Sequence, residues 1–292
     1  MLETLENEFL KIVVKDDGGS LTSVFDKKRN KECLYQPLEN SWKGQDIFIF
    51  PFIARLKDGY YLHKGEKYEL KNHGLIRYMK GKITKENEKI KVSFNSDEET
   101  LKRYPFDFEA NIIYELNQNK LKISYEIFNK NDEEMPFELG AHPAFLLPGK
   151  VDNNPFIMGG NTIEFDSAEE LYQMKLEETG SFIIDKIPYE NNGKINLTKD
   201  LFVRENTLIL KSENINEFKL NKTDGCTLIL NKGKAPFVAI RSDKVFGNYV
   251  CIEPWFGVPD MINPEREITK KKYMQFIKAN GVFKYNYEIE IA

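Results

Sequence analysis

Residues 110–128 read ANIIYELNQNKLKISYEIF. Apolar and polar side chains alternate over residues 110–116 and again over residues 121–128, and both runs are rich in β-branched and aromatic residues. The polar segment Asn117-Gln118-Asn119 between them is typical of a turn. Two such runs joined by a short turn predict an antiparallel hairpin.

The same alternation recurs along the chain, which predicts a protein built mainly from strands. Strands are expected at residues 9–14, 89–94, 207–210, 226–230, 237–240 and 283–291, with turn signals at residues 16–19, 191–193, 223–225 and 232–234. Only residues 167–178 and 265–278 have a composition compatible with a helix. Many short strands without alternating helices indicate one large antiparallel β-sandwich over residues 1–292.

Composition and charge narrow the class of protein. Of the 292 residues, 41% are hydrophobic and 30% charged, which is typical of a chain that buries a core and dissolves. The net charge of −4 arises from 42 basic and 46 acidic residues without a basic stripe, so a nucleic-acid partner is not expected. No apolar run approaches the roughly 18 residues that span a bilayer, and the acidic N-terminal segment is unlike a secretory signal. A cytoplasmic protein that does not enter the membrane is therefore expected.

The three cysteines, Cys33, Cys226 and Cys251, are odd in number and show no Cys-x-x-Cys spacing. This pattern favours buried thiols over a disulfide framework or a zinc knot. Alternation places Cys251 on the same face of its strand as Glu253.

Two segments carry candidates for acid/base chemistry. His142, one of three histidines, precedes Pro143, and Glu253 in an apolar run precedes Pro254. A following proline favours extended backbone and so fixes the direction of the side chain. An imidazole and a carboxylate on facing strands could donate and accept protons near neutral pH. A lone strand histidine is nevertheless more often structural, and a Glu-Pro pair more often marks a strand end.

Four segments, in this order, make the chain similar to the aldose 1-epimerase (mutarotase) family over nearly its whole length. They are Phe50-Pro51-Phe52-Ile53-Ala54-Arg55-Leu56-Lys57-Asp58-Gly59, Asn72-His73-Gly74-Leu75-Ile76-Arg77, Gly140-Ala141-His142-Pro143-Ala144-Phe145 and Cys251-Ile252-Glu253-Pro254-Trp255. The resemblance implies an all-β fold, a large antiparallel β-supersandwich of the galactose mutarotase type. It also implies a sugar substrate, no metal and no cofactor.

The resemblance further implies roles for residues. Glu253 would take the proton of the anomeric hydroxyl while His142 protonates the ring oxygen, and the opened ring would close to the other anomer. His73 would bind sugar oxygens or donate a second proton, and the guanidinium of Arg55 would bridge hydroxyls. Arg77 is a further candidate for substrate contact. Among the aromatic residues, Trp255 is the candidate platform for the C–H face of a sugar.

Some positions depart from the family pattern. Where an acidic residue often contacts the sugar, this chain offers Asn206, with Glu205 as a rival. Ala144 stands where an aromatic residue is usual, and Arg241 replaces a frequent tryptophan. These departures leave the identity of the sugar open.

Three alternatives to a hexose mutarotase remain. Two histidines and a carboxylate on a β scaffold could form a cupin-like metal site, although the chain has no His-x-His ligand pair. A binding protein could keep the cleft without catalysis. A hexose-6-phosphate mutarotase could use Arg55, Arg77 and Arg241 to hold a phosphate. The sequence does not indicate an oligomeric state.

Overall fold

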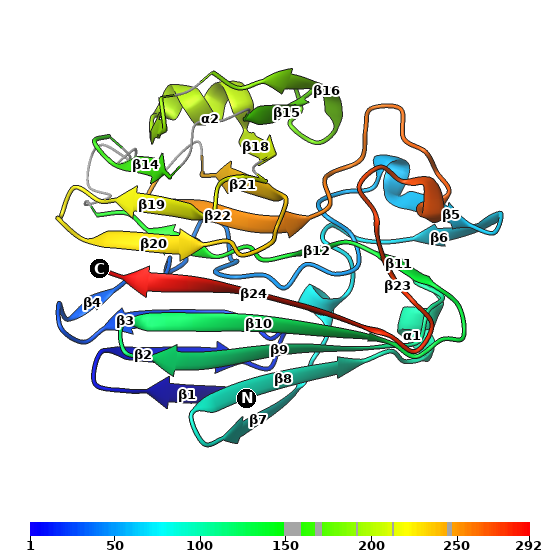
Figure 1. Ribbon diagram of the computed structural model, residues 1–292, viewed down its shortest axis with the longest axis horizontal. Helices are drawn as coiled ribbons and strands as arrows, with labels where there is room; N and C mark the ends of the chain where they lie inside the picture. The colour runs from blue at the N-terminus through cyan, green and yellow to red at the C-terminus, as the bar shows by residue number, and fades with distance from the viewer. Residues whose placement is uncertain (149–158, 167–170, 191, 212, 244–246) are drawn as a thin grey trace.

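Two large antiparallel sheets dominate the computed structural model, which describes residues 1–148, 159–166, 171–190, 192–211, 213–243 and 247–292. Within these ranges the larger sheet has nine strands, and the C-terminal strand lies beside β10 near its centre (Figure 1). In spatial order the strands are β17 (Lys194–Asn196), β14 (Thr162–Phe165), β19 (Glu217–Asn221), β20 (Thr227–Asn231), β24 (Val282–Ile291), β10 (Lys120–Asn129), β9 (Phe108–Asn117), β8 (Lys89–Asn95) and β7 (Lys82–Glu86).

The second large sheet carries the candidate site. In the described part of the chain its order is β12 (Leu139–Gly140), β22 (Tyr249–Phe256), β21 (Phe237–Arg241), β18 (Thr207–Lys211), β15 (Tyr172–Leu176) and β16 (Ile183–Pro188). Strand β13 (Ala144–Leu146) also pairs with β22.

Smaller elements complete the described structure. A four-stranded sheet is formed by β1 (Leu2–Glu6), β2 (Leu10–Lys15), β3 (Leu21–Asp26) and β4 (Lys31–Glu32). Two further two-stranded antiparallel sheets are present: the hairpin of β5 (Tyr60–His63) and β6 (Glu66–Glu69), and the long-range pair of β11 (Met135–Phe137) and β23 (Gln275–Ile277). The helical elements are α1 (Glu98–Leu101), α2 (Lys199–Glu205) and the 3₁₀ turns η1 (Lys57–Gly59), η2 (Ile76–Tyr78) and η3 (Ile268–Lys270). None of the described helices has the length and apolar character needed to cross a bilayer.

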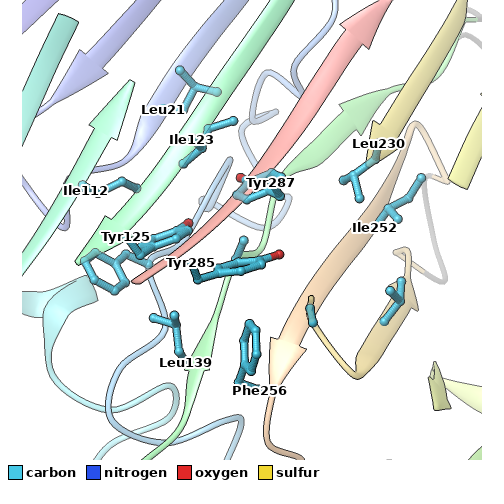
Figure 2. Packing of buried hydrophobic residues seen from close by; sticks show 14 of the residues in the cluster. Leu21, Ile112, Ile123, Tyr125, Leu139, Leu230, Ile252, Phe256, Tyr285 and Tyr287 are labelled. Carbon is cyan, nitrogen blue, oxygen red and sulfur yellow. The ribbon is translucent and has the colours of Figure 1, made fainter. Parts of the chain in front are cut away.

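The main core lies between the large sheets. Figure 2 shows Tyr285 and Tyr287 of β24 close to Ile252 and Phe256 of β22, and the rings of Phe256 and Tyr285 meet edge to face at 4.7 Å. Because side chains alternate along a strand, burying Ile252 and Phe256 in this core directs Glu253 to the opposite face of the sheet. The core therefore fixes the orientation of the candidate base.

The hairpin expected at residues 110–128 is present as β9 and β10, and the other expected strands coincide with β2, β8, β18, β20, β21 and β24. The two helix predictions are wrong. In the first, residues 167–170 lie outside the described residues, and residues 172–176 form β15. In the second, residues 265–278 contain only η3 and β23. Pairing with β16, β18 and β11 overrides local helix propensity in both segments.

Candidate active site

Strand register places Glu253 and Arg241 on one face of the second sheet. Ala239 of β21 pairs with Glu253, and Arg241 pairs with Cys251 on one side and Thr207 on the other. Since side chains at i and i+2 share a face, Thr207, Arg241, Cys251 and Glu253 all project away from the main core. This confirms that Cys251 lies on the same face as Glu253.

His142 reaches Glu253 because the segment carrying it runs along β22. The Ala141 N–H donates to the Pro254 carbonyl at 3.0 Å, and Ala144 pairs with Cys251. Between these two contacts, His142 Nε2 lies 3.3 Å from Glu253 Oε2. Both side chains are buried, with relative exposures of 2% and 1% for the two residues. The two candidates for acid and base thus form a close pair.

Several polar atoms of this pair and its neighbours have no hydrogen-bond partner among the described residues. They are both carboxylate oxygens of Glu253, Nδ1 of His142, Nε1 of Trp255 and Nε of Arg241. Unpaired buried polar atoms cost stability, and they concentrate here around a cavity. Such a group of donors and acceptors is suited to a polar ligand rich in hydroxyls.

Burial shifts the pKa values of the pair in opposite directions. It raises the pKa of Glu253 well above its usual 4.5, and the positive charge of Arg241 offsets part of this shift. It lowers the pKa of His142 well below 6.5, with further lowering from His73 and Arg241. Burial alone therefore favours the uncharged form of both groups.

His73 lies against His142, with ring centroids 5.5 Å apart and the rings edge to face. Its backbone has a positive φ of 64°, and its Nδ1 accepts a hydrogen bond from the Ala54 N–H at 3.2 Å. Burial, reinforced by Arg77, Arg241 and Arg55, lowers the pKa of His73 to about 3. The ring is therefore neutral at physiological pH and, with Nδ1 accepting, carries its hydrogen on Nε2.

A cavity of about 320 Å³ brings most of the predicted site residues together. Its lining includes Glu253, His142, His73, Arg55, Asn206 and Trp255. Arg77 is not part of this lining. It borders a neighbouring cavity of about 220 Å³, together with Trp42 and Asp46.

The structure separates Asn206 from Glu205. Asn206 lines the cavity at the end of α2, and its side-chain amide donates to the Gly180 carbonyl at 3.3 Å. A Cβ added to Gly180 would lie 2.1 Å from that amide nitrogen, so the close approach requires glycine. Glu205 instead accepts hydrogen bonds from Gln173 at 2.5 Å and Lys175 at 3.2 Å, outside the lining of the cavity.

Sequence reasoning did not select three residues that shape this region. Arg241 lines the cavity beside Glu253, whereas the sequence suggested it only as a departure from the family pattern and as a possible phosphate contact. The Trp42 ring lies 5.0 Å from the His142 ring. Asp46 is buried with the backbone N–H groups of His142, Ile47 and Leu21 facing its carboxyl group. The sequence could have indicated Asp46, because its carboxylate stands at the start of an apolar run in Gln45-Asp46-Ile47-Phe48.

One group of side chains has the composition of a metal site. Single ligand atoms of His142, Cys251 and Glu253 lie within 4.8 Å of one another, and all three residues are buried. Nitrogen, sulfur and carboxylate ligands suit zinc, although the guanidinium of Arg241 on the same face would oppose a cation there.

Comparisons with known proteins identify the family. The family model for aldose 1-epimerase matches residues 1–275. The chain therefore belongs to the aldose 1-epimerase family, a family of sugar epimerases, and its fold is the galactose mutarotase-like sandwich expected from the sequence.

Individual relatives are similar along their whole lengths. A galactose mutarotase related enzyme from Lactobacillus acidophilus is 28% identical with a TM-score of 0.92, and the match covers 100% of this chain and 97% of that one. A galactose mutarotase-like protein from Lactobacillus casei shares the fold at 22% identity, a TM-score of 0.92 and 100% coverage of both chains. The plasmid-encoded protein LacX of Lactococcus lactis subsp. lactis is 25% identical over 301 residues, with 98% of each chain covered.

Proposed function

We propose that this protein is an aldose 1-epimerase that interconverts the α and β anomers of a hexose or a related sugar, with Glu253 as base and His142 as acid. The observation that carries the proposal is the unpartnered, buried carboxylate of Glu253, 3.3 Å from the His142 imidazole in a cavity. The cavity volume lies near the lower end of the roughly 300–1,000 Å³ typical of small-molecule sites, which suits a single sugar ring.

The reaction needs one proton to be accepted and one to be donated. Glu253 removes the proton of the anomeric hydroxyl, the C1 carbonyl forms, and the electron pair of the C1–ring oxygen bond moves to the ring oxygen. That oxygen takes its proton from His142, which must therefore be protonated beside the ionised Glu253 when the sugar binds, although burial lowers its pKa. After rotation about the C1–C2 bond, the same steps run in reverse on the other face of the carbonyl. The two groups then regain their starting protonation states, so neither protons nor electrons are lost.

The remaining residues of the lining bind and orient the sugar. His73 is assigned as a hydrogen-bond donor through Nε2, because its Nδ1 already accepts from the Ala54 N–H and its pKa of about 3 keeps the ring neutral. Asn206 can both donate to and accept from a hydroxyl. Arg55 is exposed at the cavity, where its guanidinium can bridge neighbouring hydroxyls. The indole of Trp255 supplies an apolar surface together with an N–H donor.

A hexose 6-phosphate is the second candidate substrate. Arg55 and Arg241 both line the cavity, and two guanidinium groups near one ligand favour an anion. Arg77 does not join them, because it borders the neighbouring cavity. The third Arg of the sequence-based hypothesis therefore gives no support to this candidate.

The test is exchange of α and β anomers, followed by polarimetry or NMR, for glucose, galactose, other aldoses and hexose 6-phosphates. Glu253→Gln keeps the size of the side chain and should lower the rate by roughly 100- to 10,000-fold, the usual contribution of a general base. Glu205→Gln is the matched control, since Glu205 lies next to Asn206 but bonds outside the cavity. Full activity of Glu253→Gln would refute the proposal. A folded wild type that binds a sugar and accelerates no exchange would indicate a binding protein.

A further inference from the structure

Arg241 is a charged residue of the cavity that the mechanism above does not use. It ends β21, opposite Cys251 and on the same face as Glu253. The residue is half-buried, and its Nε atom is buried without an acceptor. Within the described part of the chain no ion pair or hydrogen bond holds this guanidinium, so its position is explained neither by a structural salt bridge nor by a cap.

Glu253 is the only acidic side chain among the residues that line the cavity in the described structure. Of the two arginines in that lining, Arg55 is exposed, whereas Arg241 is half-buried beside the candidate base. Charges interact more strongly where water is excluded, so the location of Arg241 gives it the larger effect on Glu253.

The Trp255 indole also lowers the pKa of Glu253, by less than Arg241, whereas the other titratable and charged groups around Glu253 do not supply this effect. His142 faces it from the segment between β12 and β13, and Cys251 precedes it on β22. Asp46, in the segment before Pro51, acts in the opposite sense and raises the pKa of Glu253. His73 is neutral, with a pKa of about 3. Arg241 is the charged residue that lowers the pKa of Glu253 against its burial.

The proposed reaction gives this effect a role. Ring opening begins with an ionised Glu253, yet burial favours the protonated carboxyl group. A protonated Glu253 beside a neutral His142 corresponds to the protonation state reached after ring opening, from which the first step cannot begin. A fixed positive charge near Glu253 favours its carboxylate form; because the same charge also lowers the pKa of His142, its useful effect is confined to the ionisation of Glu253.

We propose that Arg241 is a positioning residue of this reaction: its guanidinium is the countercharge that holds Glu253 in the ionised, proton-accepting form. The inference rests on the proposed function and adds a residue that acts through Glu253 without contacting the reacting atoms of the sugar.

The first experiment compares pH profiles of kcat/KM for wild type, Arg241→Gln and Arg241→Lys with a neutral aldose and with a hexose 6-phosphate. In Arg241→Gln the acidic limb should move up by roughly one to three pH units, the usual effect of losing an adjacent opposite charge. At pH values below the wild-type limb, activity should therefore fall about tenfold for each pH unit by which the limb moves and recover as the pH rises. Arg241→Lys keeps the charge and should return the limb most of the way to the wild-type position.

Arg55→Gln is the matched control, because it removes the exposed arginine of the same cavity. It should raise KM without moving the acidic limb. An unmoved limb in Arg241→Gln would overturn the inference. So would an effect confined to the KM of hexose 6-phosphates, which would make Arg241 a substrate-binding residue.

A second measurement separates failure of this inference from failure of the proposed function. The ¹³C carboxyl resonance of Glu253, assigned by its loss in Glu253→Gln, is titrated in wild type and Arg241→Gln without any substrate. A higher pKa in Arg241→Gln supports the electrostatic role even if no sugar is exchanged. Equal pKa values overturn it even in an active mutarotase.

Discussion

Asp46→Asn should change how the stability of this protein depends on pH. Burial raises the pKa of the Asp46 carboxyl group from an ordinary 3.8 to about 7, although the backbone N–H groups of His142, Ile47 and Leu21 offset part of the effect. The difference is about 3 units, which corresponds to about 4 kcal/mol at 1.36 kcal/mol per unit. The residue is 2% exposed, so screening by solvent reduces this figure little.

The sign follows from proton binding. Between about pH 4 and pH 7 the unfolded chain has released the Asp46 proton while the folded protein still holds it, so wild-type stability falls as the pH rises through this window. Above about pH 7 both states are ionised, and this contribution to the pH dependence ends. Asparagine has no proton to release. The free energy of unfolding of Asp46→Asn, minus that of wild type, should therefore grow by up to about 4 kcal/mol from pH 4 to pH 8.

Urea unfolding of both proteins at pH 4, 5, 6, 7 and 8 measures this difference directly. The change of this free-energy difference with pH reports the titration of Asp46, because the effects of the substitution on packing and hydrogen bonding do not vary with pH. Asp17→Asn, which removes an exposed carboxylate from the same neighbouring cavity, is the control. A difference that stays flat with pH, or that grows equally in the control, would refute the reasoning.

Three further predictions concern catalysis, an ion pair and metal. His142→Gln should lower the exchange rate roughly 100- to 10,000-fold with an unchanged circular dichroism spectrum, and an unaltered rate would remove His142 from the mechanism. Lys271→Met removes the ion-pair partner of the fully buried Glu138, whose carboxylate lies 2.5 Å from Lys271 Nζ. The substitution should lower the free energy of unfolding by roughly 3–5 kcal/mol. Lys284→Met, which removes one member of a more exposed ion pair, is the control and should change that free energy little. Activity should survive dialysis against EDTA, and a loss restored by zinc would revive the metal-site alternative.

The sandwich was predictable because its information is local. Hairpins such as β9 and β10 show period-2 alternation and a polar turn, both of which can be read from a short window of sequence. Short elements such as η3 and β23 could not be predicted from a short window of sequence. Residues 265–278 become η3 and β23 because Lys271 bonds to buried Glu138 and β23 pairs with β11, and both partners lie more than a hundred residues away in the sequence.

The same distinction applies to the site. Glu253 and His142 stood out as polar residues in apolar segments before proline, and the structure brings their side chains together. The choice of Asn206 over Glu205 for the cavity depended on the end of α2, which sequence alone does not fix to one residue. The placement of Arg77 outside the cavity, and of Arg241 beside Glu253, depended on strand register and on the path of loops.

The most direct test of the central claim is anomer exchange by wild type and Glu253→Gln, with Glu205→Gln as control, across neutral aldoses and hexose 6-phosphates. We predict that wild type and the control accelerate exchange of at least one sugar, and that Glu253→Gln loses roughly 100-fold or more of that rate while still folded. Equal rates in wild type and Glu253→Gln, or no acceleration of any sugar by a folded wild type, would contradict the assignment of Glu253 as the base of a mutarotase.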